Sequence, residues 1–204
     1  MSEKPVKILT LVSGNGSNLQ ALIDAEKKGG LEGGTIAGVV SDSPGIYALE
    51  RARFAGIPAY TELPVLSEGK FQRNLSDRIL GIARRENAGL IILAGFLSIL
   101  AGELLEVYEG KIINLHPSLL PKFAGEGMKG EAVHRAVLAA GETESGCTVH
   151  LVDKGIDTGA ILLRRAVPVL PGDTPHSLAD RIHQEEHIAL VEAASMMIYR
   201  LRRT

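Results

Sequence analysis

Short apolar runs alternate with amphipathic helical segments through the first half of the chain. The apolar runs lie at 6–12, 35–40, 57–60, 90–94 and 111–115, and helical spacing of apolar residues lies between them, at 18–26, 46–55, 71–82 and 101–108. Such alternation is typical of a parallel sheet with helices on both of its faces. The run 90–94 is almost wholly apolar, as expected for a strand that is covered on both sides.

The pattern changes after residue 115. Residues 116–130 are rich in Gly and Pro and are predicted to form a long loop, which in a compact domain is often functional. A helix is predicted over 130–140, two strands that could pair over 146–152 and 160–169, and one long helix from residue 174. Because no break in composition and no internal repeat divides the chain, we expect a single domain over 1–204.

Composition excludes several kinds of function. The net charge is −2, and aromatic residues make up 4% of the chain with no Trp, which argues against binding to a phosphate backbone or to stacked bases. The single cysteine, Cys147, excludes an intrachain disulfide framework and fits a reducing compartment. The N-terminal apolar stretch is too short for a signal peptide, and no run approaches the ~20 apolar residues of a membrane span. We therefore expect a cytoplasmic protein that binds neither nucleic acid nor membrane.

A glycine-rich turn, Ser-Gly-Asn-Gly-Ser-Asn at 13–18, joins the first predicted strand to the first helix. Glycine allows a close approach of the backbone, and free N–H groups at the start of a helix favour an anion. The turn lacks the Lys-Ser/Thr of a Walker motif, and Leu19 stands where the dinucleotide motif requires a third glycine. A small phosphate ester is therefore favoured over ATP or NAD. The alternative is a tight turn in which Ser17 or Asn18 simply caps the helix.

Two polar side chains occur at the end of the apolar strand predicted at 111–115. Asn114 and His116 are two residues apart, so they share one face of the strand at its carboxyl end, where open α/β sheets bind ligands. The Asn114 amide could stabilise an oxyanion, and His116 could transfer a proton near neutral pH. The alternative is that both side chains only satisfy loop backbone groups.

An acidic segment framed by glycines, 153–159, joins the two later strands. Asp157 could orient His116 and stabilise its protonated form, because a nearby opposite charge favours a charged imidazole. Turn hydrogen bonds are the alternative role for Asp153 and Asp157. The spacing alone does not bring residues 116 and 157 together.

A possible metal motif occurs in the C-terminal helix. His183, Glu186 and His187 match H-x-x-E-H, a zinc-peptidase pattern, but no obvious third ligand follows, so no metal is predicted. Three other histidines show no metal-binding spacing either: His134, His150 and His176. Cys147 lies within a predicted strand and is assigned to the core rather than to nucleophilic catalysis.

Taken with their neighbours, these motifs resemble the phosphoribosylglycinamide formyltransferases, the folate-dependent glycinamide ribonucleotide transformylases of purine synthesis within the formyltransferase family. The resemblance covers about residues 6–190. It is carried by the segments SGNGSNLQALIDA (13–25), LAGFLSIL (93–100), INLHPSLLPKF (113–123), GCTVHLVDKGIDTGAIL (146–162) and QEEH (184–187). The pair NLHPSLLP and SGNGSN is much more specific than an Asn-x-His with a distant Asp, which several formyl-group enzymes share.

The resemblance implies a fold and a reaction. The implied fold is α/β, a Rossmann-like, mostly parallel sheet with helices on both faces, extended by C-terminal strands and a long C-terminal helix. A phosphate- or nucleotide-binding half is expected at about 1–110 and a catalytic and folate-binding half at about 111–204. The implied reaction transfers a formyl group from 10-formyltetrahydrofolate, a co-substrate, to the amine of 5-phosphoribosylglycinamide, without a metal. These small molecules are the implied partners, and the protein is expected to be a monomer or a homodimer.

The resemblance also implies three groups of site residues. The catalytic residues are Asn114, His116 and Asp157. The ribonucleotide contacts are Gly16, Ser17 and Asn18 at the phosphate and the helical segment His183, Gln184, Glu185 and Glu186, with Glu186 near the amine. The folate contacts, largely through backbone groups, are Lys70, Leu97, Ser98, Ile99, Leu100, Asp153, Lys154, Gly155 and Ile156, together with Asn114 and Asp157.

The chain departs from the family pattern in places. The family often has Arg where this chain has Ser98, and Lys70 matches a basic group of the family only across a gap. The Gly-rich loop 123–134 is longer than in some members and is predicted to be a mobile flap.

Four other functions are alternatives. Formyltetrahydrofolate hydrolases carry an extra N-terminal regulatory domain, and methionyl-tRNA formyltransferases carry a C-terminal RNA-binding domain; neither domain is expected here. A non-catalytic folate or nucleotide sensor and a plain NAD-binding protein are the others. The presence of Asn114, His116 and Asp157 argues against a sensor.

Overall fold

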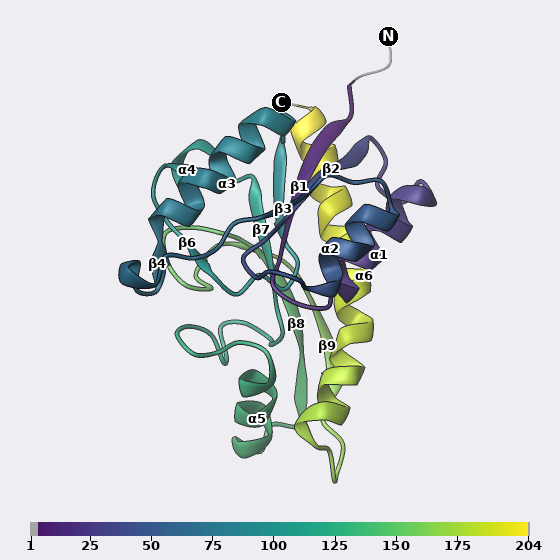
Figure 1. Ribbon diagram of the computed structural model, residues 1–204. Helices are drawn as coiled ribbons and strands as arrows, with labels where there is room; N and C mark the ends of the chain where they lie inside the picture. Colours follow the sequence, from purple (N-terminus) through teal and green to yellow (C-terminus); the bar gives the residue numbers. More distant parts are fainter. Residues whose placement is uncertain (1–3, 204) are drawn as a thin grey trace.

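A computed structural model describes residues 4–203 and contains one large sheet with helices on both faces (Figure 1). The strands are β1 (Val6–Val12), β2 (Gly34–Ser41), β3 (Ala59–Thr61), β4 (Phe71–Gln72), β5 (Leu90–Leu93), β6 (Ile99–Leu100), β7 (Ile112–His116), β8 (Glu144–Leu151) and β9 (Ile161–Pro168). The helices are α1 (Ser17–Lys27), α2 (Tyr47–Phe54), the 3-10 turn η1 (Leu66–Glu68), α3 (Arg73–Glu86), α4 (Glu103–Val107), α5 (Glu131–Ala139) and α6 (Pro175–Arg202). The described residues do not include 1–3 or 204. Residues 1–3 belong to the segment that was considered as a signal peptide, and residue 204 is the end of the predicted domain.

The seven-stranded sheet has the order β3-β2-β1-β5-β7-β8-β9. Its first five strands are parallel, whereas β8 is antiparallel to β7 and β9 is antiparallel to β8. The predicted mostly parallel sheet with a C-terminal strand extension is therefore confirmed. The parallel strands bring the carboxyl ends of β1, β5 and β7 to one edge of the sheet, which is where the candidate site lies.

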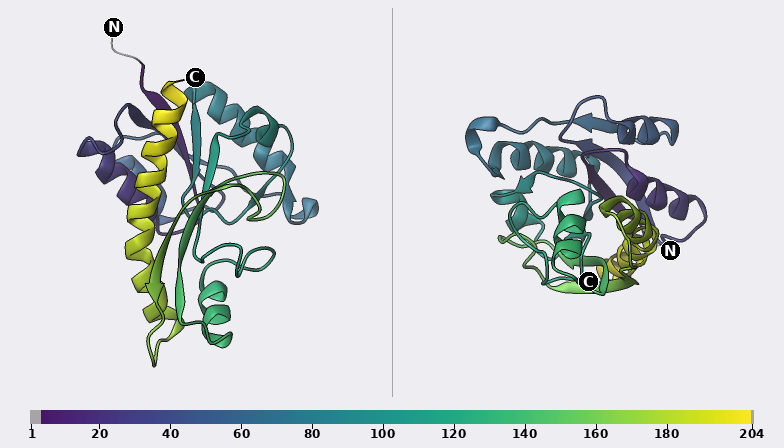
Figure 2. Two further views of the ribbon diagram at one scale, coloured as in Figure 1. Left: turned by 180° about the vertical axis from the view of Figure 1, so that it is seen from behind. Right: turned by 90° about the horizontal axis from the view of Figure 1, so that it is seen from below.

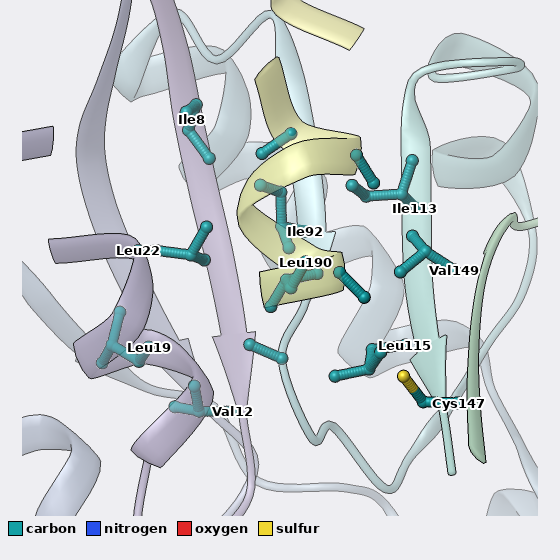
Figure 3. Packing of buried hydrophobic residues seen from close by; sticks show 14 of the residues in the cluster. Ile8, Val12, Leu19, Leu22, Ile92, Ile113, Leu115, Cys147, Val149 and Leu190 are labelled. Carbon is teal, nitrogen blue, oxygen red and sulfur yellow. The ribbon is translucent and has the colours of Figure 1, made fainter. Parts of the chain in front are cut away.

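Two apolar layers hold the sheet between its helices. One face packs against α1, α2, α5 and α6, and the other packs against α3 and α4. Strand alternation divides β1 between the layers, so that Ile8 belongs to the first and Leu9 to the second. Leu190 of α6 belongs to the first layer together with Ile92 and Ile113 (Figure 3). Burying a side chain of this size stabilises the fold by about 1.5–3 kcal/mol.

Cys147 is fully buried in the first layer, as predicted (Figure 3). Burial raises the pKa of its thiol to about 12. The thiol is therefore protonated at neutral pH, and the cysteine contributes to packing rather than to nucleophilic chemistry.

The long helix α6 runs along the sheet beside β8 and β9, and α5 lies near its N-terminal end (Figures 1 and 2). The helix begins where Thr174 and Ser177 form a reciprocal capping box, with Pro175 in the first turn. Its buried face includes the carboxylate of Glu186, which is 4% exposed among apolar neighbours such as Ile182 and Leu190. A buried acid on an otherwise apolar helix face indicates a function beyond packing.

The helix predicted over 71–82 begins two residues later than expected. Phe71 is 41% exposed and lies in β4, where it pairs with Ile99 of β6 in a separate two-stranded sheet. The apolar step from Phe71 to Leu75 fits helical spacing, but the backbone at 71–72 is used for strand pairing, which periodicity does not report. The segment 93–100 likewise contains the unpredicted strand β6, and β3 lies slightly beyond the predicted 57–60.

Within residues 4–203, none of the helices combines the length and the apolar character needed to cross a membrane.

Candidate active site

A cavity of about 670 Å³ opens at the carboxyl ends of β1, β5 and β7. Its walls come from the carboxyl ends of these strands and the segments that follow them, at 14–18, 93–100 and 114–117, and from 125–130, 152–153, 155–157 and α6. Strand register helps to assemble it, because Leu93 of β5 pairs with Asn114 of β7. The cavity therefore joins the glycine-rich turn to the polar end of β7, as expected for the binding edge of an open α/β sheet.

The structure brings Asn114, His116 and Asp157 into this cavity together. His116 is 4% exposed, and its Nδ1 lies 3.5 Å from Oδ2 of Asp157. Asp157 has a left-handed backbone, with φ 58, and its Oδ2 accepts a hydrogen bond of 3.1 Å from the Gly125 N–H. The loop that carries Asp157 thus turns back over the end of β7, which spacing along the chain does not indicate.

Both ring nitrogens of His116 face protein groups. Nε2 lies 2.8 Å from the carbonyl oxygen of Phe123, which can only accept, so Nε2 carries a hydrogen. Nδ1 faces the carboxylate of Asp157, and this contact is favourable when Nδ1 is also protonated. A ring that carries hydrogen on both nitrogens would satisfy both contacts. For His116 to donate a hydrogen bond directly to a substrate oxygen, as expected, Nε2 would have to leave the Phe123 carbonyl oxygen. Stabilisation of an oxyanion by a positive charge on the ring would not require that contact to break.

A further histidine, His150, completes the cluster and was assigned no role from the sequence. Its Nδ1 lies 2.8 Å from the Leu151 carbonyl oxygen, so Nε2 is free to accept a hydrogen bond of 3.1 Å from Nδ2 of Asn114. The same Nε2 lies 3.7 Å from Oδ1 of Asp157. Burial lowers the pKa of His150, which agrees with a neutral ring.

The sequence signal for His150 lies in strand alternation. Thr148 and His150 are the polar members of an otherwise apolar run, and in the antiparallel ladder they pair with His116 and Asn114 respectively. Paired residues of an antiparallel ladder project from the same face of the sheet. Knowledge of the pairing register would therefore have assigned His150 to the site.

The glycine-rich turn forms the second end of the cavity. Gly16 is the N-cap of α1 in a left-handed conformation, with φ 80, and no side chain among the described residues caps this helix end. The first N–H groups of α1 are therefore available to an anion. Ser13 ties the turn to the 95–97 segment, because its N–H donates to the Gly95 carbonyl oxygen over 3.1 Å and its Oγ accepts from the Leu97 N–H over 2.8 Å. The alternative of a helix capped by the Ser17 or Asn18 side chain is thus wrong.

Only part of the predicted ribonucleotide segment of α6 faces the cavity. His183 and Glu186 line it, and Glu186 accepts a hydrogen bond of 3.2 Å from Nδ2 of Asn18. Gln184 and Glu185 are not among the lining residues, and Glu185 instead forms an ion pair of 3.3 Å with Arg165. Residues three apart share a helix face, whereas the two between them are turned away, so the expected contacts of Gln184 and Glu185 are corrected.

The predicted folate segments line the opposite part of the cavity. Its lining residues here are Leu97, Ser98, Ile99, Leu100, Asp153, Gly155, Ile156 and Lys70. Lys154 is the exception: it is exposed and lies 3.3 Å from Glu106, outside the cavity lining, so its expected contact is corrected. Lys70 forms an ion pair of 2.7 Å with Glu126, and the Ser98 hydroxyl donates to Asp42 over 2.7 Å. The Ser98 side chain is thus directed into the protein, and its backbone remains for ligand contacts.

His134 of α5 also lines the cavity and is 3% exposed. Its Nδ1 has no hydrogen-bond partner among the described residues. Burial, with a smaller contribution from His183, lowers the pKa of His134 to about 4. The ring is therefore neutral at physiological pH.

A stability prediction follows from this lowered pKa. Protonation of His134 favours the unfolded chain. The contribution of neutral His134 to the free energy of unfolding is therefore complete above pH 6.5, and up to about 3 kcal/mol of that free energy is lost as the pH falls towards 4. Chemical denaturation between pH 7 and 4 should show a shallower loss of unfolding free energy for His134→Leu than for the wild type. His176→Leu is the control, because the His176 side chain is 88% exposed. Equal pH dependence in His134→Leu and the wild type would contradict the prediction.

Within residues 4–203, no group of three or more His, Cys, Asp or Glu side chains is arranged to hold a metal ion. His183 and Glu186 of the H-x-x-E-H motif lie at the cavity wall, with Nε2 of His183 4.0 Å from Glu186. Two members of the motif therefore line the cavity, and one of them, Glu186, bonds to Asn18 of the glycine-rich turn.

Comparison with known proteins agrees with this geometry. The formyl transferase family matches residues 6–194. The chain is 43% identical over 205 residues to the trifunctional purine biosynthetic protein adenosine-3 of Drosophila melanogaster, covering 97% of this chain and 14% of that protein. It is 39% identical to the chloroplastic phosphoribosylglycinamide formyltransferase of Vigna unguiculata, covering 94% and 60%. It also superposes on the crystal structure of glycinamide ribonucleotide transformylase 1 from Symbiobacterium toebii with a TM-score of 0.86 and 38% identity, covering 96% and 88%.

The fold is that of the formyl transferase family, and the chain belongs to this family. Among members of this family it is similar to phosphoribosylglycinamide formyltransferases. The sequence-based predictions of a formyltransferase and of a Rossmann-like fold are confirmed. The chain spans 14% of the length of the trifunctional relative, so the full activity is treated below as a proposal.

Proposed function

We propose that the chain transfers a formyl group from 10-formyltetrahydrofolate to the primary amine of 5-phosphoribosylglycinamide, giving formylglycinamide ribonucleotide and tetrahydrofolate in purine synthesis. One observation carries this proposal: the glycine-rich turn, which suits a phosphate, opens into the same cavity as a polar cluster. The cluster consists of an amide, two imidazoles and a carboxylate, from Asn114, His116, His150 and Asp157. Relatives that carry the phosphoribosylglycinamide formyltransferase name support the choice of acceptor.

The ribonucleotide is assigned to the end of the cavity formed by α1 and α6. Its phosphate would accept hydrogen bonds from the N–H groups that follow Gly16, at Ser17 and Asn18. Glu186 lies next to this turn through its hydrogen bond with Asn18, so its carboxylate can accept hydrogens from the ribose or the amine. Binding the phosphate far from the reacting carbon supplies free energy that can orient the amine.

The folate is assigned to the opposite wall, between the 97–100 segment and the 153–157 segment. Backbone N–H and C=O groups of these segments suit the ring amide and amine groups of a pterin. Lys70 at this wall is the basic group assigned to the folate, and it pairs with Glu126 in the described structure. Because Ser98 bonds to Asp42, it contributes to donor binding only through its backbone.

The reaction is a direct displacement at the formyl carbon. The amine nitrogen attacks that carbon, the carbonyl oxygen becomes an oxyanion, and the bond to the folate nitrogen then breaks. Asn114 has one amide hydrogen on His150 and a second that can be donated to the oxyanion. The His116 imidazolium, held between Phe123 and Asp157, supplies a positive charge beside it.

Asp157 is assigned to proton transfer. The attacking amine must lose a proton and the departing folate nitrogen must gain one, so the net reaction needs no external acid or base. The Asp157 carboxylate faces both His116 and His150, which allows it to accept the proton from the amine and return it, directly or through water. Neither a nucleophilic side chain nor a metal is needed for these steps.

A direct assay tests the proposal. The chain, 10-formyltetrahydrofolate and 5-phosphoribosylglycinamide are mixed, and the change in folate absorbance is followed. We expect turnover that depends on the ribonucleotide and yields one formylated product per folate released. Turnover without the ribonucleotide would instead indicate a hydrolase, and binding without turnover would indicate a sensor.

A substitution in the phosphate turn should act mainly on ribonucleotide binding. A Cβ at Gly16 would lie 2.6 Å from Cβ of Ala48, on a backbone with φ +80, so Gly16→Ala must displace the turn. We expect the KM for the ribonucleotide to rise by about tenfold or more, with a smaller change in kcat, because the phosphate hydrogen bonds that the displaced turn weakens are remote from the reacting carbon.

The control for this substitution is Gly45→Ala. Gly45 also has a positive φ, of +67, but a Cβ there meets nothing within 4 Å, and Gly45 is not among the cavity-lining residues. Gly45→Ala therefore reproduces the backbone strain without the clash. A KM that is unchanged in Gly16→Ala would show that the turn does not bind the phosphate.

The whole chain is proposed to act as one formyltransferase domain. The proposed phosphate turn belongs to the half 1–110 and the proposed catalytic cluster to the half 111–204. The proposed folate segment 97–100 and the α6 segment with Glu186 cross this division, so each substrate would contact both halves. A cytoplasmic location and a monomeric or homodimeric state remain predictions.

A further inference from the structure

Arg51 of α2 reaches back to the glycine-rich turn and uses its whole guanidinium group there. Its Nε donates to the carbonyl oxygen of Asn15 over 2.9 Å, and its Nη2 donates to Oδ1 of the same residue over 2.9 Å. Its Nη1 donates to Oε1 of Gln20 in α1 over 3.0 Å. The planar group therefore fixes both the main chain and the side chain of one turn residue, and joins them to the first turns of α1.

The start of α2 also forms the wall behind the turn. The Ala48 N–H donates to the Gly14 carbonyl oxygen over 3.4 Å, and Ala48 leaves no space for a side chain at Gly16. Cδ of Arg51 comes within 3.4 Å of the place that a Cβ of Gly16 would occupy. The ring of Tyr47 lies 4.6 Å from the Arg51 guanidinium carbon and supports its plane.

The charges around the cavity give this arginine a second role. The acidic residues that line the cavity are Glu126, Asp153, Asp157 and Glu186, and the Lys and Arg residues that line it are Lys70 and Lys129. Lys70 is paired with Glu126. A phosphate dianion would therefore approach a cavity lined by more acids than permanently charged bases. Arg51 places a positive charge directly against the turn, where it contacts Asn15 and the backbone position of Gly16.

We propose that Arg51 is a positioning residue of the phosphate site. It holds Asn15 so that the following N–H groups face the anion, and its charge reduces the electrostatic cost of binding a dianion. This inference rests on the assignment of the turn to a phosphate ester in the proposed function. A merely structural role for Arg51 would affect the melting temperature and leave substrate affinities unchanged.

The kinetic test compares Arg51→Gln and Arg51→Lys with the wild type. We expect Arg51→Gln to raise the KM for the ribonucleotide by about tenfold or more, because misaligned N–H groups of the turn would lose hydrogen bonds to the charged phosphate, each of which typically contributes about that much. The value of kcat and the KM for the folate should change far less. Arg51→Lys keeps the positive charge but loses the bidentate geometry. Its KM for the ribonucleotide should therefore lie between that of the wild type and that of Arg51→Gln. The dependence of this KM on ionic strength should be weaker in Arg51→Gln.

Arg53→Gln is the matched control. Arg53 lies on the same helix, its side chain is 60% exposed, and it pairs with Glu50 rather than with the turn. We expect its kinetics to match the wild type. Thermal unfolding of every variant accompanies the kinetics, so that loss of fold is recognised independently.

A binding measurement separates this inference from the proposed function. Titration calorimetry with ribose 5-phosphate should show binding to the wild type and to Arg53→Gln, and at least about tenfold weaker binding to folded Arg51→Gln. Equal binding and equal KM in Arg51→Gln and the wild type would overturn the role of Arg51 alone. If the wild type binds ribose 5-phosphate but transfers no formyl group, the proposed reaction is wrong. The role of Arg51 at the phosphate site is then decided by the difference in ribose 5-phosphate affinity between the wild type and Arg51→Gln.

Discussion

Replacing His116 with alanine is expected to lower kcat for formyl transfer by about 10³-fold, while the KM of each substrate changes little. The reason is the position of the ring, held between the Phe123 carbonyl oxygen and Asp157 at the end of β7. In the proposed mechanism, a protonated His116 ring stabilises mainly the oxyanion, so its loss should affect the transition state more than substrate binding. Steady-state kinetics with each substrate varied in turn measures the effect.

Two further variants make this result interpretable. His116→Gln retains an N–H that can reach Phe123 but carries no charge, so it should be nearly as slow as His116→Ala if the charge is responsible. His176→Ala is the control, because His176 is exposed at the start of α6. Loss of His116 leaves the Phe123 carbonyl oxygen without the donor described here, which should cost about 1–3 kcal/mol of unfolding free energy and is measured by denaturation. A folded His116→Ala with near-wild-type kcat would remove His116 from the catalytic group.

Replacing Asp157 with asparagine is expected to lower kcat by about 10²–10⁴-fold. Asparagine has nearly the same shape and tolerates the left-handed backbone at this position, where φ is 58. Its Oδ1 can still accept from the Gly125 N–H, so the loop should stay in place. The substitution removes the negative charge that faces His116 and His150, and with it the group that accepts a proton from the amine.

Asp180→Asn is the matched control for this variant, because Asp180 is a half-exposed partner of His176 on α6, away from the cavity. We expect it to show wild-type kinetics and stability. If Asp157→Asn retains wild-type kcat over the whole accessible pH range, proton transfer must be assigned to another group, and His150 is the nearest candidate.

Local features of the site could be predicted from the sequence, because they depend on residues that are neighbours along the chain. Asn114 and His116 were assigned to the end of a strand by period-two alternation, and the glycine-rich turn to a strand-to-helix junction. Both assignments match the structure. The parallel order of strands then placed these features at one edge of the sheet.

The remaining features depend on contacts between distant segments. The approach of Asp157 to His116 is set by the fold of the loop after β8, and the role of His150 by the register between β7 and β8. Arg51 contacts a turn 36 residues earlier in the chain, and nothing in its own helix marks it out. The misassignment of Phe71 has a related cause, since apolar spacing does not report whether the backbone is used for pairing.

The ladder between β7 and β8 also limits how sequences of this kind can change length. Asn114 lies opposite His150, and His116 lies opposite Thr148. Inserting or deleting a single residue inside either strand would rotate half of these side chains to the far face of the sheet. Length variation among natural or engineered homologues should therefore be confined to connections such as 140–143 and 169–174, which adjoin the ends of β8 and β9 that are farthest from the loop carrying Asp157.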